Sequence, residues 1–569
     1  MRFLPFVPAL VLLHQPLTTA GQVLHWANVL GVSGESMIQQ VRTDALENVY
    51  VMGRMANTGS VDLDPGPNSA TLSWDFGGLP GSGYFIAKYD STGLFLWGYR
   101  ADAARSIAVS PSGELVICAY LDPYVPWDAD PGSGVHPLDG PGTGVVRWTT
   151  DGTFVSAIVL EGASSIHCLT NNTGDVFLAG QYMGAFDADP GPDTTLLMSN
   201  GFFDLWVARL NAADELVWAV SIGNEGMEYA CDLVRAGTDL LVSMRTVGPN
   251  PMEQFDVDPG PGTAMTTFNQ NQGAVALRLD QDGQYVQHVS FDWAVDWRAP
   301  ILGMLPDGGI ALAGSYSGQA GFDTGDTVFT VLSWGSDAFI QRMAGSGWSP
   351  SWADLFSSQY GNEIIYGMAP FKDGAILVCG MFTHAFDADP GPGTDTYAPS
   401  ASSGAAWIGS YCYTDGSYIW SAMINGGSRD VLYDLCWSPA DALLLGGGLS
   451  TGADIGLAGG SYLIATTASS SAMVARYRSV DTQCVTVPTD IPEGQAFAPR
   501  IRVLDGRLVV DGIAPGGTLR VLGSLGQLVV EQRYMGQGTS IPMEGWPTGV
   551  YVVEVMGAQR VVRRICTTH

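Results

Sequence analysis

The feature that most constrains the fold is an internal repeat that recurs seven times along this 569-residue chain. Each copy opens with an apolar strand, a turn and a second apolar strand, and the turns are rich in Pro, Asp and Gly, as hairpin loops are. The opening hairpins span residues 41–53, 107–119, 169–180, 233–244, 302–314, 368–380 and 435–446. Self-similarity at a fixed period predicts a repeat architecture rather than several unrelated domains.

An acidic loop follows each opening hairpin. Five copies of the loop read Asp-x-Asp-Pro-Gly, a sixth is degenerate at Asp323, and the seventh keeps a single aspartate, Asp454. The complete copies contribute the pairs Asp62 and Asp64, Asp128 and Asp130, Asp187 and Asp189, Asp256 and Asp258, and Asp387 and Asp389. Successive loops start 59 to 69 residues apart, which suits a blade of four strands with one long loop.

Each copy ends in a second hairpin, as at residues 85–89 and 95–97, so every unit supplies four strands. A lone four-stranded sheet cannot bury both faces, whereas seven sheets stacked radially close on themselves. The segment 23–27 matches the fourth strand of another unit, 216–219, yet precedes the first full unit. We therefore expect it to complete the last blade. The alternative is that residues 483–487 supply that strand locally.

Several of these strands carry a recognisable signature. Val-Tyr-Val-Met-Gly at 49–53, Val-Phe-Leu-Ala-Gly at 176–180 and Trp-Val-Ala-Arg-Leu at 206–210 resemble the bacterial seven-bladed propeller repeats often abbreviated SBBP. The resemblance covers residues 23 to about 478. Together with the repeat, it implies an all-β chain whose main domain is a seven-bladed β-propeller.

The N-terminus has the pattern of a secretory signal peptide. Met1-Arg2 supplies a charged start, an apolar stretch follows from Phe3 to Leu13, and small residues lead to Ala20. We expect residues 1–20 to be this signal, with a buried N-terminal strand as the alternative. No later stretch is long and apolar enough to predict a membrane span.

The composition changes after the propeller. We expect the propeller to occupy residues 21–478 and a linker to occupy residues 479–499. Residues 500–569 carry eight Arg against five acidic residues, although the whole chain has a net charge of −31. Their short apolar strands predict a small Ig-like β-sandwich.

The C-terminal module contains a second resemblance. Residues 519–527, Trp-Pro-Thr-Gly-Val-Tyr at 546–551 and the terminal Arg563-Arg564 resemble the type A sorting domain of the type IX secretion system of Bacteroidetes-like bacteria. This implies export by that machinery across the outer membrane, removal of the module, and a mature protein that is secreted or attached to the cell surface. The ending at residues 566–569 departs slightly from the family pattern. The alternative is a generic adhesive β-sandwich domain that does not act in sorting.

The paired aspartates of the acidic loops have two interpretations. In an extended chain, carboxylates at i and i+2 point the same way, and hard oxygen ligands at that spacing suit calcium. Alternatively, Pro-Gly forms a tight turn that the first aspartate caps, with the second aspartate solvated. The turn explains the Pro-Gly but not the recurrence of both carboxylates, so calcium is retained as a possible cofactor at the ten aspartates of the five pairs.

The sequence lacks the features of several functional classes. Lys88 and Lys372 are the only lysines, which argues against nucleic-acid binding. The chain has no G-x-S-x-G, H-E-x-x-H or P-loop motif, and its seven histidines are isolated. We expect a non-catalytic, exported binding or scaffold propeller whose partner is an extracellular polymer, glycan or protein. The alternative is a secreted hydrolase or lyase with its site on the acidic loop face or in the central channel.

The positions of the cysteines and tryptophans within the repeat indicate which of them pack in the core. The eight cysteines form no C-x-x-C pair, and those inside apolar strands, such as Cys118 and Cys379, read as small core residues rather than disulfides. Trp97, Trp218 and Trp420 recur at one strand position, which indicates packing. Tryptophans outside that register remain candidates for ligand contact: Trp127, Trp293 and Trp297.

Overall fold

A computed structural model gives the structure of the chain. It describes most of residues 23–478 and the strands between residues 500 and 567. The short gaps in the first part are 78–80, 249–253, 269–270, 293, 296–299, 325–327, 359–360, 392, 401, 458–460 and 467. The predicted signal peptide, residues 1–20, and the predicted linker, residues 479–499, lie outside the described residues. The chain divides into two compact units, Met1–Pro390 with Asp395–Cys484, and Val485–His569 with the short segment Gly391–Thr394.

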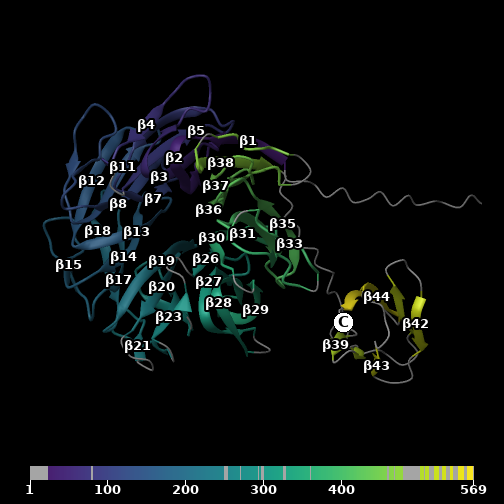
Figure 1. The fold of residues 1–569 in the computed structure, drawn as a ribbon. Coiled ribbons are helices and arrows are strands. Elements are labelled where there is room, and N and C mark those ends of the chain that lie inside the picture. Colours follow the sequence, from purple (N-terminus) through teal and green to yellow (C-terminus); the bar gives the residue numbers. More distant parts are fainter. Residues whose placement is uncertain are drawn as a thin grey trace, which may run out of the picture. The chain divides into compact units, whose positions relative to one another are not determined.

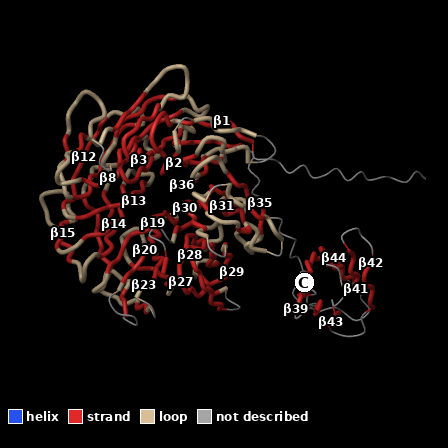
Figure 2. Tube along the Cα trace, in the orientation of Figure 1, coloured by secondary structure: helices blue, strands red, loops and turns tan. Residues whose placement is uncertain are grey.

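The first unit is a seven-bladed β-propeller, as the repeat predicts. Seven antiparallel sheets stand around a central axis, and their first strands face the middle of the ring (Figure 1). Among the residues that the structure describes, none lies in a helix (Figure 2). Consecutive strands within a sheet are neighbours, so each unit of the sequence repeat forms one meander.

The strands form four concentric layers. The innermost are β2 (Gly31–Thr43), β7 (Ala104–Val109), β13 (Ala163–Thr170), β19 (Met227–Ala236), β25 (Ala294–Val295) with β26 (Ile301–Met304), β30 (Glu363–Pro370) and β36 (Val431–Trp437). The second strands are β3 (Val49–Asp62), β8 (Glu114–Leu121), β14 (Val176–Tyr182), β20 (Asp239–Val247), β27 (Ile310–Asp323), β31 (Ala375–Phe382) and β37 (Leu443–Leu449). The third are β5 (Ser82–Tyr89), β11 (Gly142–Thr149), β17 (Asp204–Leu210), β23 (Gln272–Leu279), β28 (Val328–Ala344), β34 (Ala405–Cys412) and β38 (Ser471–Arg478). The outer strands are β6 (Phe95–Arg100), β12 (Phe154–Glu161), β18 (Leu216–Ile222), β24 (Tyr285–Phe291), β29 (Ser349–Phe356), β35 (Tyr418–Ile424) and β1 (Val23–Val29).

The acidic loops add short ladders between the second and third strands. These are β4 (Thr71–Trp74), which pairs with β3, and the hairpins β9 (Trp127–Asp128) with β10 (Pro137–Leu138), β15 (Ala185–Asp187) with β16 (Leu196–Met198), β21 (Gln254–Asp256) with β22 (Met265–Thr267), and β32 (Phe386–Asp387) with β33 (Thr396–Tyr397). Because the meander reverses direction at each strand, these loops all leave their sheets at the same end.

The N-terminal strand β1 closes the ring. It pairs antiparallel with β38, from Val23 opposite Arg478 to Val29 opposite Met473, and so forms the outer strand of the seventh sheet. The indole nitrogen of Trp26 donates a 3.1 Å hydrogen bond to the Ser91 carbonyl of the first sheet. The seventh sheet thus combines segments from both ends of the propeller, which ties those ends together.

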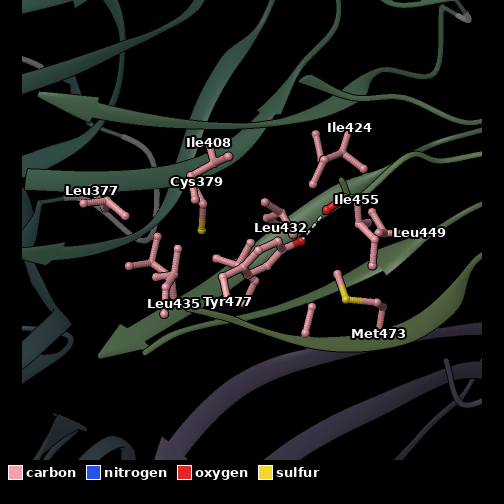
Figure 3. Close-up of a cluster of buried hydrophobic side chains, with 14 of the residues drawn as sticks. Leu377, Cys379, Ile408, Ile424, Leu432, Leu435, Leu449, Ile455, Met473 and Tyr477 are labelled. Atoms are coloured by element: carbon pink, nitrogen blue, oxygen red, sulfur yellow. Dashed lines mark hydrogen bonds between the residues drawn. The ribbon is translucent and has the colours of Figure 1, made fainter. Parts of the chain in front are cut away.

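The hydrophobic core lies between sheets rather than within them. One cluster of buried side chains fills the space between each pair of consecutive sheets. Figure 3 shows the cluster between the sixth and seventh sheets, where Leu377 and Ile408 of one sheet face Leu435 and Tyr477 of the next. Each sheet is therefore stable only with neighbours on both sides, which explains why the repeat must close.

The C-terminal unit consists of two antiparallel sheets. One has the strand order β39 (Arg500–Leu504), β40 (Arg507–Asp511), β43 (Gly538–Pro542). The other has the order β42 (Leu528–Arg533), β41 (Thr518–Gly523), β44 (Gly549–Met556), β45 (Arg560–Thr567). The strands agree with the predicted all-β module, while its Ig-like sandwich packing and the boundaries at 478 and 500 stay predictions. The motif residues 524–527 and 546–548 lie outside the described residues.

Candidate functional site

In the acidic loops, the first aspartate of each pair is a backbone acceptor. Asp187 shows the pattern: its Oδ1 accepts hydrogen bonds from the backbone N–H of Asp189, at 3.2 Å, and of Thr195, at 2.9 Å. The same two bonds, to the residues two and eight positions later, recur at Asp62, Asp128, Asp256 and Asp387. One carboxylate oxygen therefore closes the whole loop.

The second aspartate caps the Pro-Gly turn. The Oδ1 of Asp189 accepts a 2.7 Å bond from the N–H of Gly191, two residues later. Asp64, Asp130 and Asp258 bind their glycines in the same way. Both carboxylates thus have a local structural role, which accounts for the recurrence that the turn interpretation left unexplained.

The residue between the two aspartates is a hydrophobic plug. It is fully buried in each of these loops and in the loop of Asp454, as Leu63, Ala129, Ala188, Val257, Ala388 and Ile455. In four of the loops an aromatic side chain of the third strand donates a hydrogen bond to its carbonyl, as Tyr477 does to Ile455 at 2.7 Å (Figure 3). The motif therefore anchors the loop to the core between two sheets.

The five aspartate pairs lie in five separate loops, one per sheet. Among the described residues, no group of three or more His, Cys, Asp or Glu side chains is arranged to hold a metal ion. The single aspartate Asp454 keeps the same turn, accepting from the N–H groups of Gly456 and Tyr462. The assignment of calcium to the ten aspartates stays a prediction.

The second candidate region is the central channel. A cavity of about 1080 Å³ is lined by innermost-strand residues from all seven sheets. In the innermost strands of six sheets the register shifts by one residue, which marks a β-bulge. Five of the extra residues line the channel: Gln39, Arg105, Cys231, Tyr366 and Tyr433. The bulges therefore place an additional, non-repeating side chain at the channel wall.

The residue after the bulge links neighbouring sheets. The Oδ2 of Asp434 accepts a 2.8 Å bond from the N–H of Val41 in the next sheet, and Gln40 Oε1 accepts from Ile107 at the same distance. Asp232 Oδ2 accepts likewise from Leu302, at 2.8 Å. These side chains satisfy backbone groups on the inner edges of the ring.

Asp232 is a channel carboxylate whose titration is perturbed by burial. Burial raises the pKa of its carboxyl from 3.8 to about 6, despite the two backbone hydrogen bonds that oppose the rise. The Nδ1 atom of His167 lies 4.0 Å from Asp232 Oδ1. Sequence inspection missed this pair because the two residues are 65 positions apart and come from different repeats.

Cysteines and tryptophans largely have packing roles. Cys118, Cys168, Cys231 and Cys379 are buried thiols, as predicted for core residues, whereas Cys412 is disulfide-bonded and corrects that prediction at one position. Trp97 and Trp218 each donate from the indole nitrogen to a loop carbonyl of the next sheet, at 3.1 and 3.0 Å. Trp127 is only 8% exposed, so it presents little surface to a ligand. Trp293 and Trp297 lie outside the described residues.

Sequence reasoning also missed the arginines of the channel. The cavity is lined by Arg42, Arg54, Arg105, Arg235 and Arg429, against two carboxylates, Asp232 and Asp434. None of the five arginines belongs to a recurring motif, so the repeat gave no signal for them. Their assembly depends on ring closure.

The described part of the chain contains no helix that could span a membrane. No protein-family model matches the chain. An uncharacterized WD repeat-containing protein of Acanthamoeba polyphaga mimivirus is 25% identical over 269 residues, which is 41% of this chain and 19% of that protein. The match thus spans about a fifth of that relative's length.

Two solved structures align with the chain at low similarity. PorZ of Porphyromonas gingivalis, described as an essential bacterial surface component of the type IX secretion system, aligns with a TM-score of 0.22 and 10% identity, covering 94% of this chain and 81% of its own. Quinohemoprotein alcohol dehydrogenase of Comamonas testosteroni aligns with a TM-score of 0.36 and 11% identity, covering 92% and 77%. At these scores neither likeness carries an inference about fold or function.

Proposed function

We propose that this chain is an exported protein of the cell surface or the extracellular medium, whose propeller binds an extracellular ligand without catalysis and whose C-terminal module directs its export. The observation that carries the binding role is the channel. Its cavity of about 1080 Å³ is large enough for a small ligand and has polar and aromatic lining residues from different sheets. The closed ring holds those side chains in place before any ligand arrives.

The export role rests on the two ends of the sequence. The charged and apolar start of residues 1–20 supports a signal peptide. The motifs at 519–527 and 546–551 support a type IX sorting domain, and the surrounding strands form two antiparallel sheets. We propose the type IX secretion machinery as the partner of residues 500–569.

Export is tested in a bacterium that has a type IX system and in a matched strain that lacks it. The full chain is expected outside the first strain only. A chain truncated before Arg500 is expected to remain in the periplasm of both. Equal appearance of the full and truncated chains in the medium would contradict the sorting role.

Calcium binding by the acidic loops is a second part of the proposal. The Oδ1 atoms of Asp187 and Asp189 are committed to backbone N–H groups, and each carboxylate has a second oxygen to offer. A cation bound to the folded state raises its melting temperature. We expect the full chain to melt higher in calcium than in chelator, and D187N/D189N to show a smaller shift. An unchanged melting temperature would leave the loops with their turn role alone.

A hydrolase or lyase is the alternative function, and the His167–Asp232 pair favours it. A carboxyl with a pKa near 6 beside a histidine, in a cavity, has the form of an acid–base pair. However, Asp434 and Gln40 occupy the same position after the bulge in other sheets and bind the same kind of backbone N–H. Turnover of a polysaccharide by the full chain, abolished in His167→Ala, would establish the alternative; binding without turnover would support the non-catalytic role.

A further inference from the structure

The central channel is positively charged although the protein is strongly acidic. The chain carries a net charge of −31, with 25 Lys and Arg against 56 Asp and Glu. The channel reverses this ratio, with five arginines and two aspartates among its lining residues. So local an inversion of charge is typical of a site that attracts an anion.

Both channel carboxylates are already engaged. Asp434 forms a 2.6 Å ion pair with Arg42 and accepts a hydrogen bond from the Val41 N–H. Asp232 accepts from the N–H groups of Leu302 and Leu233, each at 2.8 Å. Neither forms an ion pair with another channel arginine among the described residues. These two carboxylates therefore do not offset the charge of the remaining arginines by direct pairing.

Three of the remaining arginines lie at one end of the channel, and we name them the arginine mouth: Arg54, Arg105 and Arg429. They come from the first, second and seventh sheets, which are consecutive around the ring. Arg105 is the second residue of β7, and Arg429 precedes β36 by two positions. Arg54 pairs with Met37, before the bulge of β2. Innermost strands all run in one direction, so their starting residues share the end that carries the acidic loops.

Neutral groups orient these guanidinium groups. Arg54 donates from Nε and Nη2 to the Ser82 hydroxyl, at 3.0 and 2.6 Å. The guanidinium carbon of Arg105 lies 4.7 Å from the ring centroid of Tyr84, which pairs directly with Arg54 in the sheet. A hydroxyl and an aromatic face fix the position of a guanidinium without neutralising its charge.

Most other arginines of the propeller are paired with carboxylates. Among the described residues, carboxylates form ion pairs with Arg42, Arg100, Arg147, Arg209, Arg278, Arg342 and Arg476. Arg54, Arg105 and Arg429 form none with described residues. Of the other described propeller arginines without an ion pair, Arg235 lines the channel, whereas Arg245 and Arg478 do not. Four of these six unpaired arginines therefore lie at the channel.

Aromatic rings accompany the arginine mouth. The rings of Tyr366 and Tyr433 lie 5.1 Å apart between centroids, and both residues occupy bulge positions that line the channel. Tyr84 lines it as well. Flat tyrosine faces beside arginines suit a ligand that has both a sugar-like ring and a negatively charged group.

We propose that the arginine mouth binds the oxyanion of a small acidic ligand, of the sugar-acid class, within the channel. The proposal names the ligand class of the binding function proposed above and rests on it. The acidic surface of the chain repels long polyanions, whereas a short anion fits inside the cavity, where the local charge is positive. A carboxylate, sulfate or phosphate group supplies the oxygen pairs that guanidinium groups bind.

The test is calorimetric titration of the purified full chain with sodium glucuronate, glucose and sodium sulfate at low ionic strength. We expect saturable binding of glucuronate, none of glucose, and at least tenfold weaker glucuronate binding in R54Q/R105Q/R429Q. The matched control is Arg478→Gln, which should bind as the parent does, because Arg478 is an exposed arginine that ends β38, does not line the channel and forms no ion pair with described residues. Stronger binding of glucuronate than of sulfate supports a contribution from the sugar ring, whereas equal binding would contradict the sugar-acid class.

Two results would overturn the proposal: the absence of saturable binding by either anion, or equal affinity in the parent and the triple variant. Because Arg54 and Arg105 also bind local groups, the single variant Arg429→Gln, at an exposed residue, gives a second reading with the fold intact. The titration needs no secretion system, so its failure would leave the export role untouched. Failure of export would in turn leave the binding result standing.

Discussion

The acidic loops and the arginine mouth lie at the same end of the ring and use charge in opposite ways. In the loops, the repeated carboxylates bind backbone N–H groups of their own turns, as Asp187 and Asp189 do. At the mouth, Arg54, Arg105 and Arg429 form no ion pair with described residues. Residues that recur in every blade of this chain therefore serve the structure, because every blade has the same loop to close. A binding site, in contrast, uses positions that differ from blade to blade.

The largest expected effect separates two kinds of arginine. Arg147 is buried and forms ion pairs of 2.7 Å with Asp214 and 2.9 Å with Glu114. Arg147→Gln leaves Asp214 buried without its partner and should lower the free energy of unfolding by about 3–5 kcal/mol. Arg429→Gln should change it by less than about 0.5 kcal/mol. Urea unfolding followed by tryptophan fluorescence measures both, and similar losses would contradict the distinction.

The hydrophobic plug gives the next largest effect. Ile455 is fully buried between the sixth and seventh sheets, and Ile455→Ala should lower the free energy of unfolding by about 2–4 kcal/mol through the cavity it leaves. Leu463 lies in the same loop and is 63% exposed, so Leu463→Ala should cost less than about 0.5 kcal/mol. Equal costs in urea unfolding would mean that the loop is not anchored through its plug.

Asp232 predicts a pH dependence of stability. Because the pKa of its carboxyl is about 6 in the folded chain against 3.8 ordinarily, the folded state binds the proton more tightly. The resulting stability is fully present below about pH 4 and is lost as the pH rises through 6. Relative to Asp232→Asn, the free energy of unfolding of the parent should fall by up to about 3 kcal/mol as the pH rises from about 4 to above 6. A difference that stays constant across that range, in urea unfolding at each pH, would contradict the burial of this charge.

The smallest effect distinguishes geometry from charge in the acidic loops. Asp187→Ala removes an acceptor of two backbone N–H groups and should cost about 1–2 kcal/mol. Asp187→Asn keeps the acceptor and should cost less than about 0.5 kcal/mol in chelator. Asp193→Ala, at an exposed position of the same loop, is the control. In chelator, a loss in Asp187→Asn as large as in Asp187→Ala would contradict the turn role of the acceptor. A loss of that size in calcium alone would show that the negative charge is needed, as cation binding requires.

Much of the fold was predictable because it repeats. The spacing of Asp62, Asp128 and Asp187 predicts successive blades, and the hairpin pattern predicts four strands in each. The candidate binding residues were not predictable in this way. Arg54, Arg105 and Arg429 stand in dissimilar local sequences, and what unites them is the contact of the first, second and seventh sheets around the axis.

The sequence by itself determined the all-β class, the period, the positions of the acidic loops and the existence of a C-terminal module of different charge, because these depend on local pattern and composition. The tertiary structure decided what the pattern does: that Asp-x-Asp holds a buried plug, that β1 completes the seventh sheet, and that arginines from three sheets line one channel. The physical reason is that a propeller buries its apolar side chains between blades, so the neighbours that matter most are separated in the chain by an entire repeat or by the whole ring.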